Sequence, residues 1–111
     1  AMGWERVREH FRYRVNAPYE AAAEFVFASP LVPRDEAFST WARPAFASGT
    51  PVLHAVRALM ERIHSELQYE TASTEVSTPA LEALEQGKGV CQDFAHIMIG
   101  CLRSLGLPAR Y

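Results

Sequence analysis

The stretch GKGVCQDFAHIMIGCLRSLGLPARY, residues 87–111, decides the fold of this chain. Nearly every position from Val90 to Leu105 is apolar or small, and a helix that is apolar all round has to be buried. Glycines precede this run, and Gly106 with Pro108 follows it, which is typical of helix boundaries. We therefore predict a buried helix over residues 90–105.

Cys91 stands at the start of that helix. A cysteine attacks as the thiolate, and the unpaired N–H groups and dipole of a helix N-terminus favour the thiolate form. The preceding Gly87-Lys88-Gly89 allows a tight turn with little side-chain bulk, so a substrate carbonyl can approach and backbone N–H groups can hold an oxyanion. A cysteine that is simply a small buried side chain is the alternative, and chemistry alone leaves both interpretations open.

Helical spacing predicts which way the sulfur points. Positions three and four residues apart share one face of a helix, so an apolar row beginning at Cys91 is expected to face inward. The opposing row is more polar and is expected to lie outside. The first row is Cys91, Ala95, Met98, Leu102 and Leu105, and the second is Gln92, His96, Gly100 and Arg103.

Other polar side chains near Cys91 are expected to be structural. His96 lies about 140° round the helix and roughly 7.5 Å along it from Cys91, which excludes it as the base. Asp93 and His96, three apart, are predicted to form a local polar pair at the edge of the core. Cys101 is about 15 Å along the helix, beyond the reach of a disulfide. The spacing of Cys91, His96 and Cys101 matches no zinc site, so we expect no metal and no cofactor.

Further helices are predicted upstream. Apolar residues recur at intervals of three and four from Val52 to Leu67, after a Thr50-Pro51 start that is typical of a cap and a first helical position. Short helices are expected over residues 35–43 and 78–85, the second ended by Gly87, with a polar loop over 69–77. The apolar set of the long helix is Val52, Val56, Leu59, Met60, Ile63 and Leu67.

The N-terminal third gives weaker patterns. Residues 4–15 alternate between apolar and basic side chains, which favours a single strand, although a helix from Trp4 onward stays open. Residues 17–33 combine an alanine-rich piece with Pro30 and Pro33, and the second half is expected to be an extended connector.

Composition limits the class of protein. With 49% hydrophobic and 22% charged residues, the chain is of the ordinary globular kind. A net charge of −2 makes nucleic acid an unexpected partner, and no apolar run reaches the roughly 20 residues that span a membrane. Two cysteines do not make a disulfide framework, so we expect a cytoplasmic protein.

The motif around Cys91 resembles the nucleophile helix of the bacterial transglutaminase-like cysteine protease and hydrolase family. The resemblance rests on Gly89-Val90-Cys91-Gln92-Asp93-Phe94-Ala95-His96 and on the run from Leu102 to Tyr111, and it extends more weakly upstream to about Ser29. It implies a papain-like α+β core whose helical half delivers the cysteine, while a following sheet delivers a histidine and an aspartate. We therefore expect a mostly α chain, with residues 29–111 forming a partial core domain that ends before that sheet. Residues 1–28 are expected to be an N-terminal segment, and the end of a preceding domain is one reading of them.

The resemblance also implies an activity. It is cysteine-dependent acyl transfer on amide or peptide bonds, through thiolate attack and a thioester, with Cys91 as the catalytic residue and a protein or peptide as substrate. Because the implied histidine and aspartate lie outside these 111 residues, we expect the chain alone to be inactive. The alternative is a non-catalytic helical module for protein interaction. Apolar surface left uncovered on the Cys91 helix predicts a homo-oligomer.

Overall fold

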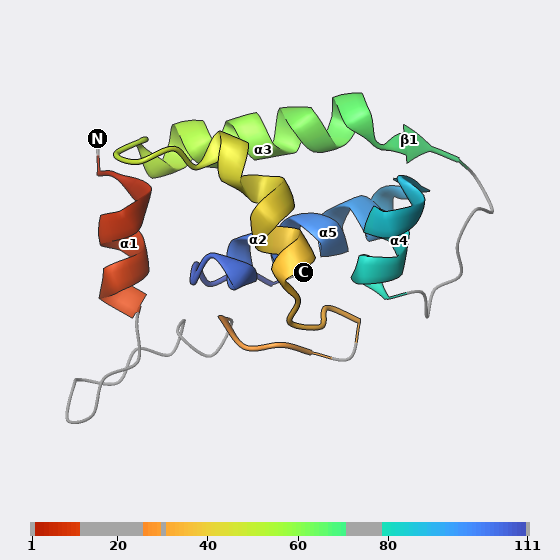
Figure 1. Ribbon diagram of the computed structural model, residues 1–111, viewed down its shortest axis with the longest axis horizontal. Coiled ribbons are helices and arrows are strands. Elements are labelled where there is room, and N and C mark those ends of the chain that lie inside the picture. Colours follow the sequence, from red (N-terminus) through yellow and green to blue (C-terminus); the bar gives the residue numbers. More distant parts are fainter. Residues whose placement is uncertain (1, 12–25, 30, 71–78, 111) are drawn as a thin grey trace.

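The computed structural model describes residues 2–11, 26–29, 31–70 and 79–110, and these residues are mostly helical (Figure 1). Five α-helices, a short 3₁₀ helix and a pair of two-residue strands make up the described part. In chain order they are α1 (Trp4–Phe11), α2 (Glu36–Ala42), η2 (Arg43–Ala45), α3 (Val52–Glu66), β1 (Gln68–Tyr69), α4 (Ala80–Gln86), β2 (Lys88–Gly89) and α5 (Cys91–Ser104).

Helix α5 is the centre of the core, as its apolar sequence predicts. It packs against α2, α3 and α4, and α2 crosses between α3 and α5 (Figure 1). Gly100 makes the α2 contact close, because a Cβ at this position would lie 2.9 Å from Cε1 of Phe38. Phe38 and Ile97 are fully buried at this crossing. The predicted helix over residues 90–105 is confirmed.

Helix α3 is also confirmed, with two differences of detail. The cap residue is Pro51 and the first helical residue is Val52, one position later than the Thr50-Pro51 pattern predicts. Ala55, Leu59 and Ile63 face the core, whereas Met60 is 44% exposed and was wrongly placed on the buried face. Arg62 ties this helix to α2 by stacking 3.9 Å from the centre of the Trp41 ring and donating to the Trp41 carbonyl.

The strand predicted from Trp4 is wrong over residues 4–11, which form helix α1. Trp4, Val7 and Phe11 are spaced three and four apart, which fits one face of a helix, whereas an alternating pattern fits Val7 and Phe11 but not Trp4. Trp4 anchors this helix to the core: its ring meets Phe46 edge to face at 5.4 Å, and its indole N–H donates to the Ala47 carbonyl at 3.1 Å. Residues 12–15 of the prediction lie outside the described residues.

The short helices and their boundaries follow the sequence closely. Asp35 caps α2 by accepting the Ala37 N–H at 2.8 Å, and Gly87, with φ of 72°, ends α4 in the left-handed conformation. Part of the predicted 69–77 loop is different, because Tyr69 belongs to β1. Residues 71–77 of that loop, and the alanine-rich piece of the 17–33 segment, lie outside the described residues.

Strands β1 and β2 form a small parallel pair that fastens α3 to the start of α5. Gln68 stands opposite Lys88 and Tyr69 opposite Gly89. The Gln68 N–H donates to the Gly87 carbonyl at 2.9 Å, and the Glu70 N–H donates to the Gly89 carbonyl at 3.0 Å. The residues just before Cys91 are thereby held in place by the end of α3.

Candidate functional site

Cys91 is the first residue of α5, and its side chain is exposed. Val90, the cap residue before it, has extended backbone angles with φ of −109° and ψ of −179°. The predicted position at a helix N-terminus is therefore confirmed. The predicted inward direction is wrong: Cys91 faces outward, whereas His96 and Gly100 of the row expected to be polar and outside are buried.

The reason lies in what packs on α5. Gly100 admits the Phe38 ring, so the small side of the helix faces α2 and turns the Cys91 row away from it. Ala95, Met98 and Leu102 of that row are partly exposed. The apolar sequence predicts that the helix is buried. It does not predict that the face with the smallest residue, Gly100, packs against α2.

Asp93 belongs to the core, and the sequence analysis missed this. Its side chain is 1% exposed, and Oδ2 accepts the Val90 N–H at 2.9 Å. An acid three residues after a cap residue is half of the pattern that marks a helix start, so the spacing from Val90 to Asp93 was the sign to follow.

His96 is buried together with Asp93, at 9% exposure. Burial lowers the pKa of His96, the Asp93 carboxylate acts in the opposite direction, and the Arg103 guanidinium adds to the lowering. The predicted pairing of Asp93 with His96 therefore exists electrostatically, inside the core and not at its edge.

Cys101 differs from Cys91 in exposure, because Cys91 is exposed and Cys101 is buried. Its side chain is fully buried on the α2 and α3 side of α5, and burial raises the pKa of its thiol to about 12, against a smaller opposing effect of Arg62. Both cysteines are free thiols, as predicted. Only Cys91 is open to a reactant.

An aromatic cluster borders the first turn of α5. Phe94, one turn after Cys91, receives the rings of Tyr69 and His64 edge to face, each with its centroid 6.2 Å from that of Phe94. Tyr69 is 57% exposed, and Phe94 is 8% exposed. Tyr69 thus packs on Phe94 in the first turn of the Cys91 helix.

Comparison with known proteins places this arrangement in a family. The model of the transglutaminase-like superfamily matches residues 39–111, which include the Cys91 helix, α3, α4 and the part of α2 from Ser39 onward. The chain belongs to the transglutaminase-like superfamily.

A solved structure shares this fold. It is reported as "a Putative Cysteine Protease from Cytophaga hutchinsonii", and it superposes with a TM-score of 0.71 at 27% identity over 86% of this chain and 33% of that one. The mostly helical architecture is therefore that of a transglutaminase-like cysteine protease fold. Membership and fold together support a general cysteine-hydrolase-like function.

Curated relatives come from mycobacteria. An uncharacterized protein of Mycobacterium tuberculosis strain H37Rv is 35% identical over 108 residues, which are 97% of this chain and 33% of the relative. An uncharacterized protein of Mycobacterium leprae is 47% identical over 57 residues, or 51% of this chain and 20% of the relative. The transglutaminase-like chain thus spans about a third of the length of the Mycobacterium tuberculosis protein.

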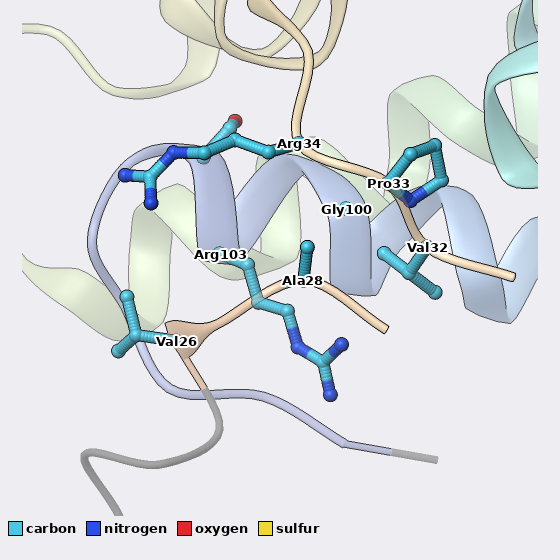
Figure 2. Close-up of a pocket in the computed structure, with 8 residues that line it drawn as sticks. Val26, Ala28, Val32, Pro33, Arg34, Gly100 and Arg103 are labelled. Atoms are coloured by element: carbon cyan, nitrogen blue, oxygen red, sulfur yellow. The ribbon is translucent and has the colours of Figure 1, made fainter. Parts of the chain in front are cut away.

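A pocket on the far part of α5 is not a substrate site. It has a volume of about 10 Å³, room for roughly one water molecule, and it lies at Gly100 and Arg103, about 13 Å along the helix from Cys91 (Figure 2). The Arg103 and Arg34 side chains at its rim point in different directions (Figure 2). Arg103 is a structural tie: it donates to the Ala109 carbonyl at 2.9 Å and to the Ser29 hydroxyl at 3.0 Å.

The described residues contain neither a candidate metal cluster nor a helix that could span a membrane. Within that part of the chain, His, Cys, Asp and Glu side chains do not gather in groups of three that could hold a metal ion. None of the helices described is long and apolar enough to cross a lipid bilayer.

Proposed function

We propose that Cys91 is the nucleophile of a cysteine-dependent acyl transfer on amide or peptide bonds. The observation that carries the proposal is the contrast between an exposed Cys91 at the N-terminus of α5 and a buried Cys101 on the same helix. Membership of the transglutaminase-like superfamily and the likeness to a cysteine protease fold support it.

The chemistry divides one difficult step into two. The Cys91 thiolate attacks the carbonyl carbon, and the electron pair of the C=O bond moves to oxygen, where first-turn N–H groups of α5 stabilise it. The C–N bond then breaks, the amine leaves with a proton from the base, and a thioester remains on Sγ. Water or a second amine attacks that thioester and releases the thiol.

The base and its orienting group come from outside the described helices in this proposal. The resemblance assigns them to a histidine and an aspartate on a following sheet, and the buried His96 is not placed to serve. We therefore expect residues 1–111 alone to bind or be alkylated at Cys91 without turning over an amide.

Tyr69 is proposed to line the acyl site, with a protein or peptide as the substrate. Its exposed ring rests on Phe94 beside the first turn of α5, where it offers an apolar wall to the group attached to the reacting carbonyl.

The decisive experiment compares two substitutions in a protein that spans the length of the relatives. Cys91→Ala is expected to abolish peptide or amide hydrolysis and Cys101→Ala to keep it, because only Cys91 is exposed. Trapping of the acyl group on Cys91, detected by mass spectrometry, would identify the thioester. Hydrolysis that survives Cys91→Ala would contradict the proposal and favour a non-catalytic interaction module.

A further inference from the structure

Asp93 is buried directly beneath the turn that carries Cys91. Its carboxylate accepts the Val90 N–H at 2.9 Å and is 1% exposed. A buried carboxylate is costly unless hydrogen bonds and favourable charges compensate it, and the positive end of a helix supplies part of that compensation. We therefore ask of the buried Asp93 carboxylate what it does for the turn before Cys91.

Gly89 fits against Asp93 from the other side of the turn. A Cβ at Gly89 would lie 2.7 Å from Cβ of Asp93 and 2.9 Å from its Oδ2, closer than side-chain atoms approach one another. Gly89 is also fixed by strand pairing, because its carbonyl accepts the Glu70 N–H. The residue before Val90 is therefore clamped between β1 and the Asp93 carboxylate.

The start of α5 is built differently from that of α2. Helix α2 begins with Asp35, whose side chain covers the first turn by accepting the Ala37 N–H. Helix α5 begins with Val90, which has no polar side-chain atom, and is fastened instead by Asp93 from inside the helix. This arrangement secures the turn while leaving the outer side of the first turn, where Cys91 lies, uncovered by a cap side chain.

We propose that Asp93 is a positioning residue for Cys91, acting through the Val90 amide and the Gly89 contact to hold Cys91 as the first residue of α5. The inference rests on the proposed role of Cys91 as nucleophile. In this role the carboxylate keeps the first-turn N–H groups directed at the sulfur, and it touches neither substrate nor reacting atoms.

Alkylation of the native chain by iodoacetamide tests the inference without any need for turnover. We expect Asp93→Ala and Asp93→Leu to slow Cys91 alkylation at neutral pH about two- to fivefold and to move its pH profile upward, which is the size of a helix-terminus effect on a charge. Asp93→Asn keeps a carbonyl oxygen for the Val90 N–H and is expected to retain the wild-type rate.

Cys101 reports unfolding in the same sample. Because it is buried and its thiol stays protonated, it is alkylated only when the chain opens. Rates for Cys91 are therefore compared in variants whose Cys101 stays unreactive. If Cys101 becomes reactive in Asp93→Ala, the comparison of Cys91 rates rests on Asp93→Leu. Leucine has a shape similar to that of aspartate but has no acceptor for the Val90 N–H.

Two glycines provide a matched pair. Gly89→Ala is expected to slow Cys91 alkylation as Asp93→Ala does, since the added methyl group collides with Asp93. Gly87→Ala adds the same methyl group two residues earlier, where it meets nothing within 4 Å, and is expected to leave the Cys91 rate unchanged despite the strain of its positive φ.

Two outcomes would overturn the inference. One is a wild-type Cys91 rate and pH profile in folded Asp93→Ala and Asp93→Leu chains. The other is a faster rate in all three Asp93 variants, which would mean that the carboxylate acts on the thiol by its charge and not through the turn. Neither outcome bears on the hydrolysis test of Cys91→Ala, so the two proposals fail separately.

Discussion

Cys91 and Cys101 are ten residues apart on one helix and differ by what packs on them. Cys101 is on the face of α5 that meets α2, with Arg62 of α3 as the nearby charge, whereas Cys91 is on the outer side of the first turn. The apolar environment stabilises the neutral thiol of Cys101 relative to the thiolate. The fold therefore accommodates Cys101 at neutral pH, where the thiol is protonated, and disfavours its ionised form.

Alkaline pH should therefore destabilise the chain through Cys101. The pKa of its thiol is raised to about 12 in the fold from 9.0, so the unfolded chain loses its proton first, and stability falls as pH rises from about 9 towards 12. Urea unfolding across this range should show a steeper loss for wild type than for Cys101→Ala. Parallel slopes in the two chains would contradict the prediction, whatever the difference in their absolute stability.

Acidic pH should destabilise the chain through His96. Burial lowers the pKa of His96 below the ordinary value of 6.5, so the unfolded chain takes up the proton first as pH falls, and stability present above pH 6.5 is lost as pH falls through the folded pKa. His96→Gln should flatten the dependence of urea unfolding on pH below about 6.5. The same substitution at the exposed His54 of α3 controls for the loss of an imidazole, and an equal flattening there would refute the assignment to His96.

At the residue scale, the sequence predicted that Cys91 begins a helix but not which way its side chain points. The glycines before Cys91 and the helical run after it were sufficient to place the thiol at a helix start. Its direction depends on Gly100 and Phe38, two residues 62 positions apart whose contact no local pattern records. Asp93 was misjudged for the same reason, since a charged residue on an apolar helix is expected at the surface unless its partner is known.

Elements with strong periodicity were predictable, and short or ambiguous ones were not. Helix α3 shows fifteen residues of helical spacing, and its start and end were predicted to within one or two residues. Helix α1 was predicted wrongly because Val7 and Phe11 continue into an apolar alternation with Tyr13 and Val15, beyond the eight residues of the helix. The pair β1 and β2 was missed because two-residue strands depend on tertiary packing and leave no period in the sequence.

The capping of α5 leads to a prediction at the scale of the element. Val90 gives the first turn no acceptor, so Val90→Thr, which keeps the shape of the side chain, should supply one and stabilise the chain by about 1 kcal/mol. Urea unfolding measures the change. Val56→Thr, the same exchange in the middle of α3, should destabilise the chain, because an interior hydroxyl gains no cap. Equal effects at both positions would rule out capping as the cause.

At the scale of the whole molecule, the helices are arranged around α5. Helices α2, α3 and α4 each pack against α5, and the strand pair connects the far end of α3 back to the start of α5 (Figure 1). The row that begins at Cys91 continues through Ala95, Met98 and Leu102, which stay partly exposed although Met98 and Leu102 also pack against the core. The thiol proposed as the nucleophile and this partly exposed apolar row therefore lie together, and whatever covers that row also borders the candidate site.

We propose that a second copy of this chain covers that row in solution, since apolar rows of this kind favour self-association. Sedimentation of residues 1–111 should show association that strengthens with concentration, and Met98→Glu should weaken it by placing a charge in the row. Leu53→Glu is the matched control: Leu53 is 78% exposed on α3, so the same charge there should leave association unchanged. A monomer at every concentration, or equal weakening by both substitutions, would exclude the α5 row as the contact.

Association through this row should also protect Cys91 from alkylation as the protein concentration rises, because Cys91 begins the row. This protection should disappear in Met98→Glu.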